Sequence, residues 1–111
     1  MVKVASIDLG SNSTRLLIAD ITNGTLTKIY KEHQVTRMAD KLSESKIISK
    51  ESTKRVLKVL AGYFKVIKRN NVENIQIVGT AALRDANNSQ DITQLIEKKF
   101  GIEVEIVSGE E

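Results

Sequence analysis

The sequence predicts a mixed α/β domain whose elements follow the order βββαβαβ and build one five-stranded sheet. The first third of the chain carries three strand-like runs separated by turn signals. The rest carries two amphipathic helix patterns, each followed by a short apolar run suited to a strand. Hairpins join antiparallel strands and crossover helices join parallel ones. We therefore expect the first three strands to be antiparallel and the last two to be added in parallel.

Composition supports one folded domain. The 111 residues are 41% hydrophobic and 28% charged, which suits a single domain with one core. There is no cysteine, no apolar run approaches the roughly 20 residues of a membrane span, and the start does not resemble a signal peptide. A net charge of +3 with only two Tyr and two Phe argues against single-stranded nucleic acid as a partner. We expect a cytoplasmic protein with neither a membrane nor a nucleic acid as partner.

The first three strands are expected in residues 2–7, 15–19 and 26–33. The first two runs are apolar, and the third alternates in polarity. Asn23-Gly24, just before the third run, is a strong hairpin signal. Residues 34–46 fit either a short helix or an ordered loop.

The clearest helix covers residues 49–70. Ser49 can cap its N-terminus, and apolar residues recur at the i, i+4, i+7 spacing of one buried face. These apolar residues are Val56, Leu57, Leu60, Tyr63, Phe64 and Ile67. The opposite face carries basic residues, namely Lys54, Lys58, Lys65 and Arg69. Two interpretations of this basic face stay open, a solvated outer surface and a groove for a long polyanion.

Residues 74–79 are predicted to form the fourth strand, and a segment of small residues, 79–84, follows it. A second helix is predicted to begin at Ser89 or Asp91 and to end at Gly101, a natural helix terminator. Residues 102–107 are the last predicted strand.

The turn between the first two strands is unusually polar. It contains Asp8, Gly10, Ser11, Asn12, Ser13 and Thr14. Backbone N–H groups in a tight turn can converge on one point as an anion nest, and Gly10 permits a close approach. Asp8, at a strand end, can bind a divalent cation directly or through water. The alternative is a plain polar hairpin in which Asp8 and Ser13 satisfy local backbone groups.

A second polar segment follows the fourth strand. Thr80 can donate a hydroxyl, and Arg84 can bind phosphate oxygens through two N–H groups. The alternative makes Thr80 a helix cap and Arg84 a surface charge paired with Asp85 or Asp91.

A third polar segment, residues 108–111, follows the last strand. A carboxylate there can orient an attacking water beside bound phosphates. The alternative is an acidic surface turn. His33 is the only histidine, and its strand-like surroundings predict a surface or packing role.

Four segments carry a resemblance to a known family. They are residues 5–13 (Ala-Ser-Ile-Asp-Leu-Gly-Ser-Asn-Ser), 78–84 (Val-Gly-Thr-Ala-Ala-Leu-Arg), 106–111 (Ile-Val-Ser-Gly-Glu-Glu) and, less specifically, 37–42 (Arg-Met-Ala-Asp-Lys-Leu). In this order they resemble the exopolyphosphatase / guanosine pentaphosphate phosphohydrolase (Ppx/GppA) family of the actin-like, sugar kinase and Hsp70 ATPase superfamily. The Asn-Ser ending of the first segment and the Gly-Thr-x-x-Leu-Arg pattern of the second point to the phosphatases.

The resemblance implies an RNase H-like (actin-like ATPase) half-domain. Residues 1–111 would be the N-terminal lobe of a two-lobed enzyme, with the C-terminal lobe absent from this sequence and the cleft between the lobes. The reaction implied is a Mg²⁺-dependent release of terminal phosphate from inorganic polyphosphate, guanosine pentaphosphate or both. By itself this lobe would be inactive or nearly so, and a homodimer of the full-length form is left open.

Site residues follow from matching positions. The resemblance implies that the first turn binds phosphate and that Arg84 contacts the phosphate chain, and we place Thr80 beside them and Mg²⁺ at Asp8. The first-turn residues so assigned are Asp8, Gly10, Ser11, Asn12 and Ser13. In the family's Ser-Gly-x-Glu-Glu-Ala motif a glutamate activates water, and Glu111 is the nearest candidate in this sequence.

Two departures from the family pattern stand out. The family's second phosphate loop, of the type Asp-x-Gly-Gly-Gly-Ser, is absent from this sequence. The second glutamate of the motif, which is the catalytic one, would fall just past Glu111. Two other functions stay open: a non-catalytic domain that senses nucleotide or polyphosphate, and a kinase-type lobe, against which the Gly-Thr-x-x-Leu-Arg segment argues.

Overall fold

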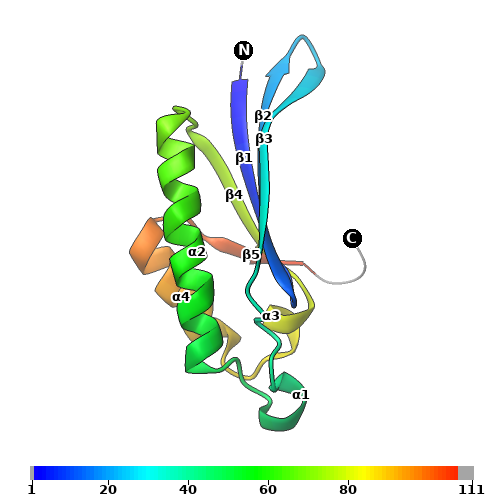
Figure 1. Cartoon of the computed structure of the whole chain (residues 1–111), viewed down its shortest axis with the longest axis vertical. Coiled ribbons are helices and arrows are strands. Elements are labelled where there is room, and N and C mark those ends of the chain that lie inside the picture. The colour runs from blue at the N-terminus through cyan, green and yellow to red at the C-terminus, as the bar shows by residue number, and fades with distance from the viewer. Residues whose placement is uncertain (1, 108–111) are drawn as a thin grey trace.

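A computed structural model describes residues 2–107 of the chain and forms one five-stranded sheet in the order β3-β2-β1-β4-β5 (Figure 1). The predicted α/β class and five-stranded mixed sheet are confirmed. The elements along the chain are β1 (Val2–Leu9), β2 (Ser13–Thr22), β3 (Thr25–Val35), α1 (Leu42–Ser45), α2 (Lys50–Arg69), β4 (Asn74–Gly79), α3 (Ala81–Asp85), α4 (Ser89–Phe100) and β5 (Val104–Ile106).

Strand directions also match the prediction. β1 and β2 pair antiparallel, as do β2 and β3, whereas β4 is parallel to both β1 and β5. The hairpin strands are longer than predicted, because pairing continues through polar residues to Leu9 opposite Thr14. Asn23 and Gly24 both have positive φ, 52° and 78°, as the type I′ turn that is favoured in two-residue hairpins requires.

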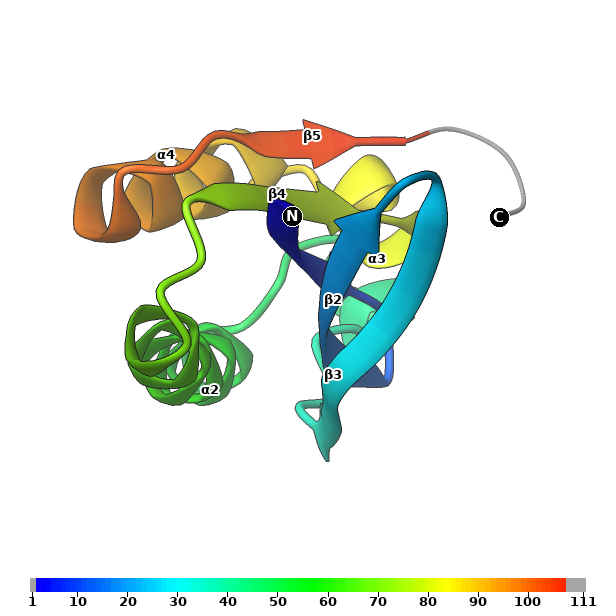
Figure 2. The same ribbon diagram turned by 90° about the horizontal axis from the view of Figure 1, so that it is seen from above.

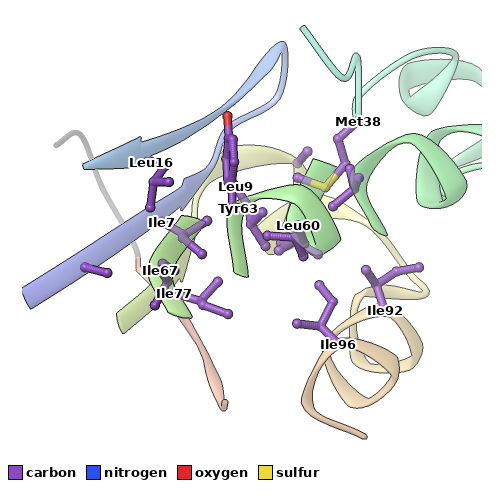
Figure 3. Close-up of a cluster of buried hydrophobic side chains, with 14 of the residues drawn as sticks. Ile7, Leu9, Leu16, Met38, Leu60, Tyr63, Ile67, Ile77, Ile92 and Ile96 are labelled. Atoms are coloured by element: carbon purple, nitrogen blue, oxygen red, sulfur yellow. The ribbon is translucent and has the colours of Figure 1, made fainter. Parts of the chain in front are cut away.

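Both long helices cover the same face of the sheet, as Figure 2 shows. Alternate residues of β1 and β2 point toward them, so Ile7, Leu9 and Leu16 are fully buried. They pack with Leu60 of α2 and Ile96 of α4 in a single core (Figure 3). Neither α2 nor α4 lies on the opposite face of the sheet, which carries Asp8 according to the alternating burial of β1.

Helix α2 follows the predicted pattern. The side chain of Ser49 accepts a hydrogen bond from the Ser52 N–H at 3.0 Å, which caps the helix. The residues buried on its inner face include Val56, Leu60, Tyr63 and Ile67. The four basic residues of the outer face are exposed, and they line neither the hollow beside Asp8 nor the hollow beside Ser11. This favours the solvated surface over the polyanion groove.

Three segments differ from the predictions in detail. Residues 34–46 contain both an ordered turn and the single-turn helix α1. The small residues after β4 form the short helix α3, which no periodicity predicted because it has only five residues. β5 is shorter than the predicted 102–107, whereas α4 begins at Ser89 and ends at Gly101, in the left-handed conformation with φ 76°, as expected. Within residues 2–107, no helix has the length and apolar character needed to cross a membrane.

Tyr63 links α2 to the sheet and gives a prediction for high pH. Its phenol donates a 2.7 Å hydrogen bond to the Thr14 carbonyl, and burial raises its pKa to about 12. Because this pKa is above that of an unfolded tyrosine, the stability it contributes is complete below pH 10 and is lost between pH 10 and 12. The free energy of unfolding should therefore fall there by up to about 1.4 kcal/mol per pH unit.

Urea unfolding of the wild type and Tyr63→Phe across pH 8–12 checks this. The variant should be about 1 kcal/mol less stable at pH 8, because the hydrogen bond is lost. The difference between the two proteins should shrink above pH 10. A difference that stays constant to pH 12 would contradict the assignment.

Candidate functional site

Two loops meet at the carboxyl ends of β1 and β4. Leu9 and Gly79 are paired at the end of the parallel ladder. Just beyond, Thr80 donates to the Leu9 carbonyl through its backbone N–H at 3.3 Å and through its hydroxyl at 3.4 Å. The first and second polar segments of the sequence are therefore neighbours, at an edge where ligands bind in open α/β sheets.

The β1–β2 turn is closed tightly on itself. The Gly10 N–H donates to the Ser13 carbonyl at 3.0 Å. A Cβ at position 10 would lie 2.9 Å from that same oxygen, a distance that side chains do not tolerate. Gly10 is therefore required by the close approach of its own turn.

Hydrogen bonds hold the carbonyl side of this turn and leave its donor side free. The Ser11 carbonyl accepts from the Ala39 N–H, and the Asn12 carbonyl accepts from the N–H groups of Thr36 and Arg37, each at 3.0 Å. Within residues 2–107, the N–H groups of Ser11 and Asn12 have no acceptor. Such a turn, with carbonyls tied inward and adjacent N–H groups free, suits an anion.

The side chains of the turn are free as well. Ser11, Asn12 and Ser13 make no side-chain hydrogen bond to any part of the chain that the structure describes. Their hydroxyl and amide groups add to the free backbone donors. The alternative of a hairpin in which Ser13 satisfies local backbone groups is therefore not supported.

Asp8 lies at the end of β1 with one carboxylate oxygen buried. Its Oδ1 has no hydrogen-bond partner in residues 2–107, and Arg15, its cross-strand neighbour, forms no ion pair with it there. A buried carboxylate oxygen without a partner is costly, which is a reason for a cation or water to bind it. The described residues contain no group of three metal-ligating side chains. Asp8 therefore fits a Mg²⁺ ion that keeps most of its waters.

A hollow of about 460 Å³ borders Asp8 on the face of the sheet away from the helices. Its lining includes basic residues from neighbouring strands, namely Arg15, Lys28, Lys31 and His33. Glu32 also lines it, and hydrogen bonds from Tyr30 and Gln34 lower the pKa of its carboxyl. We did not predict this lining from the sequence, although the alternation of β3 places Lys31 and His33 on one face.

A second hollow, of about 400 Å³, borders the turn at Ser11. Ser11 lines it together with residues of α3 and of the segment around α1, among them Ala82, Asp85 and Lys46. Ser11 of the β1–β2 turn therefore borders this second hollow, whereas Asp8, near the end of β1, borders the first.

Thr80 and Arg84 start and end one turn of α3. Thr80 is the N-cap residue, but its hydroxyl bonds the Leu9 carbonyl instead of a helix N–H. Arg84 Nε lies 3.4 Å from Asp85 Oδ1, and both side chains are well exposed. Exposed pairs of this kind contribute about 0–1 kcal/mol, so Arg84 can leave Asp85 at little cost. Contact of Arg84 with phosphate stays a prediction.

Glu111, the candidate base, lies outside the described residues 2–107. Its role stays a prediction based on the motif.

Comparison with known proteins gives a family match and related sequences. Residues 17–111 match the model of the Ppx/GppA phosphatase family. A guanosine-5'-triphosphate,3'-diphosphate pyrophosphatase of Aliivibrio fischeri is 35% identical over 107 residues, which is 96% of this chain and 22% of that protein.

Solved structures are similar over almost the whole chain. The Aquifex aeolicus member of the Ppx/GppA family superposes with a TM-score of 0.93 at 33% identity, over 98% of this chain and 36% of that one. An exopolyphosphatase from Cytophaga hutchinsonii gives 0.92 at 27%, over 96% and 34%. Thermus thermophilus RuvC, at 0.54 and 14% identity over 96% and 64%, shares the fold alone. The predicted RNase H-like fold is confirmed, and the chain spans about a third or less of the family relatives' length.

Proposed function

The chain belongs to the Ppx/GppA phosphatase family, and from this we propose that it forms one wall of the active-site cleft of a phosphoanhydride hydrolase. The reaction proposed is release of the terminal phosphate from inorganic polyphosphate, guanosine pentaphosphate or both. The observation that carries the proposal is the hydrogen bonding of the β1–β2 turn. The carbonyls of Ser11 and Asn12 accept hydrogen bonds from residues 36–39, whereas their N–H groups have no acceptor within residues 2–107.

In this proposal, the turn binds the terminal phosphate. Backbone N–H groups of Ser11 and Asn12 and the hydroxyls of Ser11 and Ser13 donate to its oxygens. Preoriented donors stabilise the charge on those oxygens in the transition state without having to reorganise. The tight Gly10–Ser13 hydrogen bond keeps these donors in place before substrate arrives.

Asp8 would hold Mg²⁺ through its unpartnered Oδ1. A bound Mg²⁺ neutralises phosphate charge and polarises the bond to the leaving oxygen. We propose Glu111, or the position after it, as the base that takes the proton of the attacking water. Because the chain spans about a third or less of its relatives' length, the rest of the cleft would come from a second lobe.

Arg84→Ala tests the proposed role of this arginine in substrate binding. Released phosphate is measured with polyphosphate and, separately, with guanosine pentaphosphate, using the protein expressed from its complete gene. One charge-assisted contact is worth about 1.5–3 kcal/mol, so kcat/KM should fall about 10- to 100-fold. The weak Arg84–Asp85 pair predicts almost no change in melting temperature.

Arg69→Ala is the matched control, because Arg69 is exposed at the far end of α2. It should hydrolyse both substrates at the wild-type rate. Unchanged turnover of Arg84→Ala would refute the role of Arg84. Tight binding of polyphosphate by the wild type without any hydrolysis would favour a sensing domain instead.

A further inference from the structure

Arg55, on α2, is hydrogen-bonded to the segment that holds the β1–β2 turn in place; this turn, which is proposed to bind phosphate, is called the phosphate turn below. Its Nε donates to the Thr36 carbonyl at 2.7 Å, and its Nη2 donates to the Arg37 carbonyl at 3.2 Å. The same Nη2 lies 2.9 Å from the hydroxyl of Ser52, which itself donates to the Arg37 carbonyl at 3.0 Å. Three donors from α2, two on Arg55 and one on Ser52, therefore bind the successive carbonyls of Thr36 and Arg37.

The N–H groups of these two residues point the other way, to the turn. Thr36 and Arg37 both donate to the Asn12 carbonyl at 3.0 Å. The residue pair is thus bonded to α2 through its carbonyls and to Asn12 through its N–H groups. Arg55 reaches the turn only through this intermediate, and it lines neither of the two hollows around the turn.

The backbone at Arg37 shows that this segment needs external support. Its φ is 52°, in the left-handed region that residues other than glycine rarely adopt. Such a conformation persists when surrounding bonds hold it. Ser52 and Thr36 are both fully buried. The hydroxyl of Thr36 lies 3.0 Å from the hydroxyl of Thr14.

We infer that Arg55 is a positioning residue for the phosphate turn. By holding the 36–37 backbone, it fixes the Asn12 carbonyl and so keeps in place the turn that carries the N–H groups of Ser11 and Asn12. An arginine is required, because its planar fork donates to two carbonyls at once, whereas a lysine presents a single charged centre. This inference rests on the proposed function for its effect on phosphate, but not for the positioning itself.

Hydrogen exchange tests the positioning directly. In Arg55→Ala the amide hydrogens of Thr36 and Arg37 should exchange at least about 10-fold faster than in the wild type, because their support is lost. Amides in the middle of α2, such as that of Tyr63, should keep their protection, since Ser49 still caps the helix. Unchanged exchange at Thr36 and Arg37 would overturn the inference.

Binding of inorganic tripolyphosphate, followed by calorimetry, tests the consequence. A misplaced binding turn should weaken affinity about 10- to 100-fold in Arg55→Ala and in Arg55→Lys. Ser52→Ala, which removes one of the three donors, should give a smaller loss in the same direction. The control is Lys58→Ala, an exposed residue on the same helix, which should bind like the wild type.

The outcomes separate the two proposals. Rescue of affinity by Arg55→Lys, or an Arg55→Ala affinity within about twofold of the wild type, would overturn the positioning role. A wild type that neither binds tripolyphosphate nor hydrolyses polyphosphate would refute the proposed function, and hydrogen exchange would still decide the role of Arg55. If Arg55→Ala fails to fold, Ser52→Ala carries both measurements.

Discussion

Replacing Asp8 by Asn should lower the hydrolysis rate of polyphosphate by about 100- to 1,000-fold. Asn has almost the same shape but no charge, and charge stabilisation by a bound cation is worth several kcal/mol in phosphoryl transfer. The buried Oδ1 of Asp8 has no partner within residues 2–107, so the substitution breaks no hydrogen bond there. The folded state should therefore survive and the activity should not.

Melting temperatures with and without Mg²⁺ separate metal binding from folding. Without the ion, Asp8→Asn should melt at or above the wild-type temperature, because an unpaired carboxylate has been removed. Millimolar Mg²⁺ should raise the melting temperature of the wild type and not that of the variant.

Asp20→Asn is the control, because Asp20 lies near the end of β2 away from the phosphate turn and accepts a hydrogen bond from Thr22. It should keep the activity and the Mg²⁺ response. Wild-type turnover of Asp8→Asn would refute the proposed role of Asp8.

Gly79→Ala and Leu83→Ala should each destabilise the protein strongly, and together they should partly compensate. Leu83 is fully buried, so its truncation should cost about 2–5 kcal/mol. A Cβ on Gly79 would overlap Leu83 Cδ1, which should cost about 1–3 kcal/mol. In the double variant the new methyl group enters space that the leucine has left.

Urea unfolding of the four proteins gives the coupling energy. We expect the double variant to be more stable than the sum of single effects predicts, by about 0.5–3 kcal/mol. Ile96→Ala combined with Gly79→Ala is the control, since Ile96 lies on α4 and none of its atoms is among the nearest neighbours of a methyl group placed at Gly79. Strict additivity of Gly79→Ala with Leu83→Ala would contradict this packing.

Local patterns predicted most of the fold. The apolar run of β2, the Asn23-Gly24 turn and the spacing of Val56, Leu60 and Ile67 each describe neighbours along the chain, and each was confirmed. The short helix α3 was implied only by the alternative in which Thr80 is a helix cap, because five residues are too few for a period to emerge. Its Leu83 is fully buried and lies close to Gly79 at the end of β4.

The candidate site, too, could be predicted from the sequence only in part. Sequence alone was sufficient to select the polar turn at Asp8–Thr14 and the segment at Thr80–Arg84, because unusual residue types next to strand ends are a local signal. It could not reveal that the carbonyls of Ser11 and Asn12 are tied to residues 36–39, nor that Arg55 supports those residues. These hydrogen bonds join parts of the chain between 18 and 28 residues apart. Only the packing of α2 against the sheet brings them within reach, and it decides which donors of the turn remain free for a ligand.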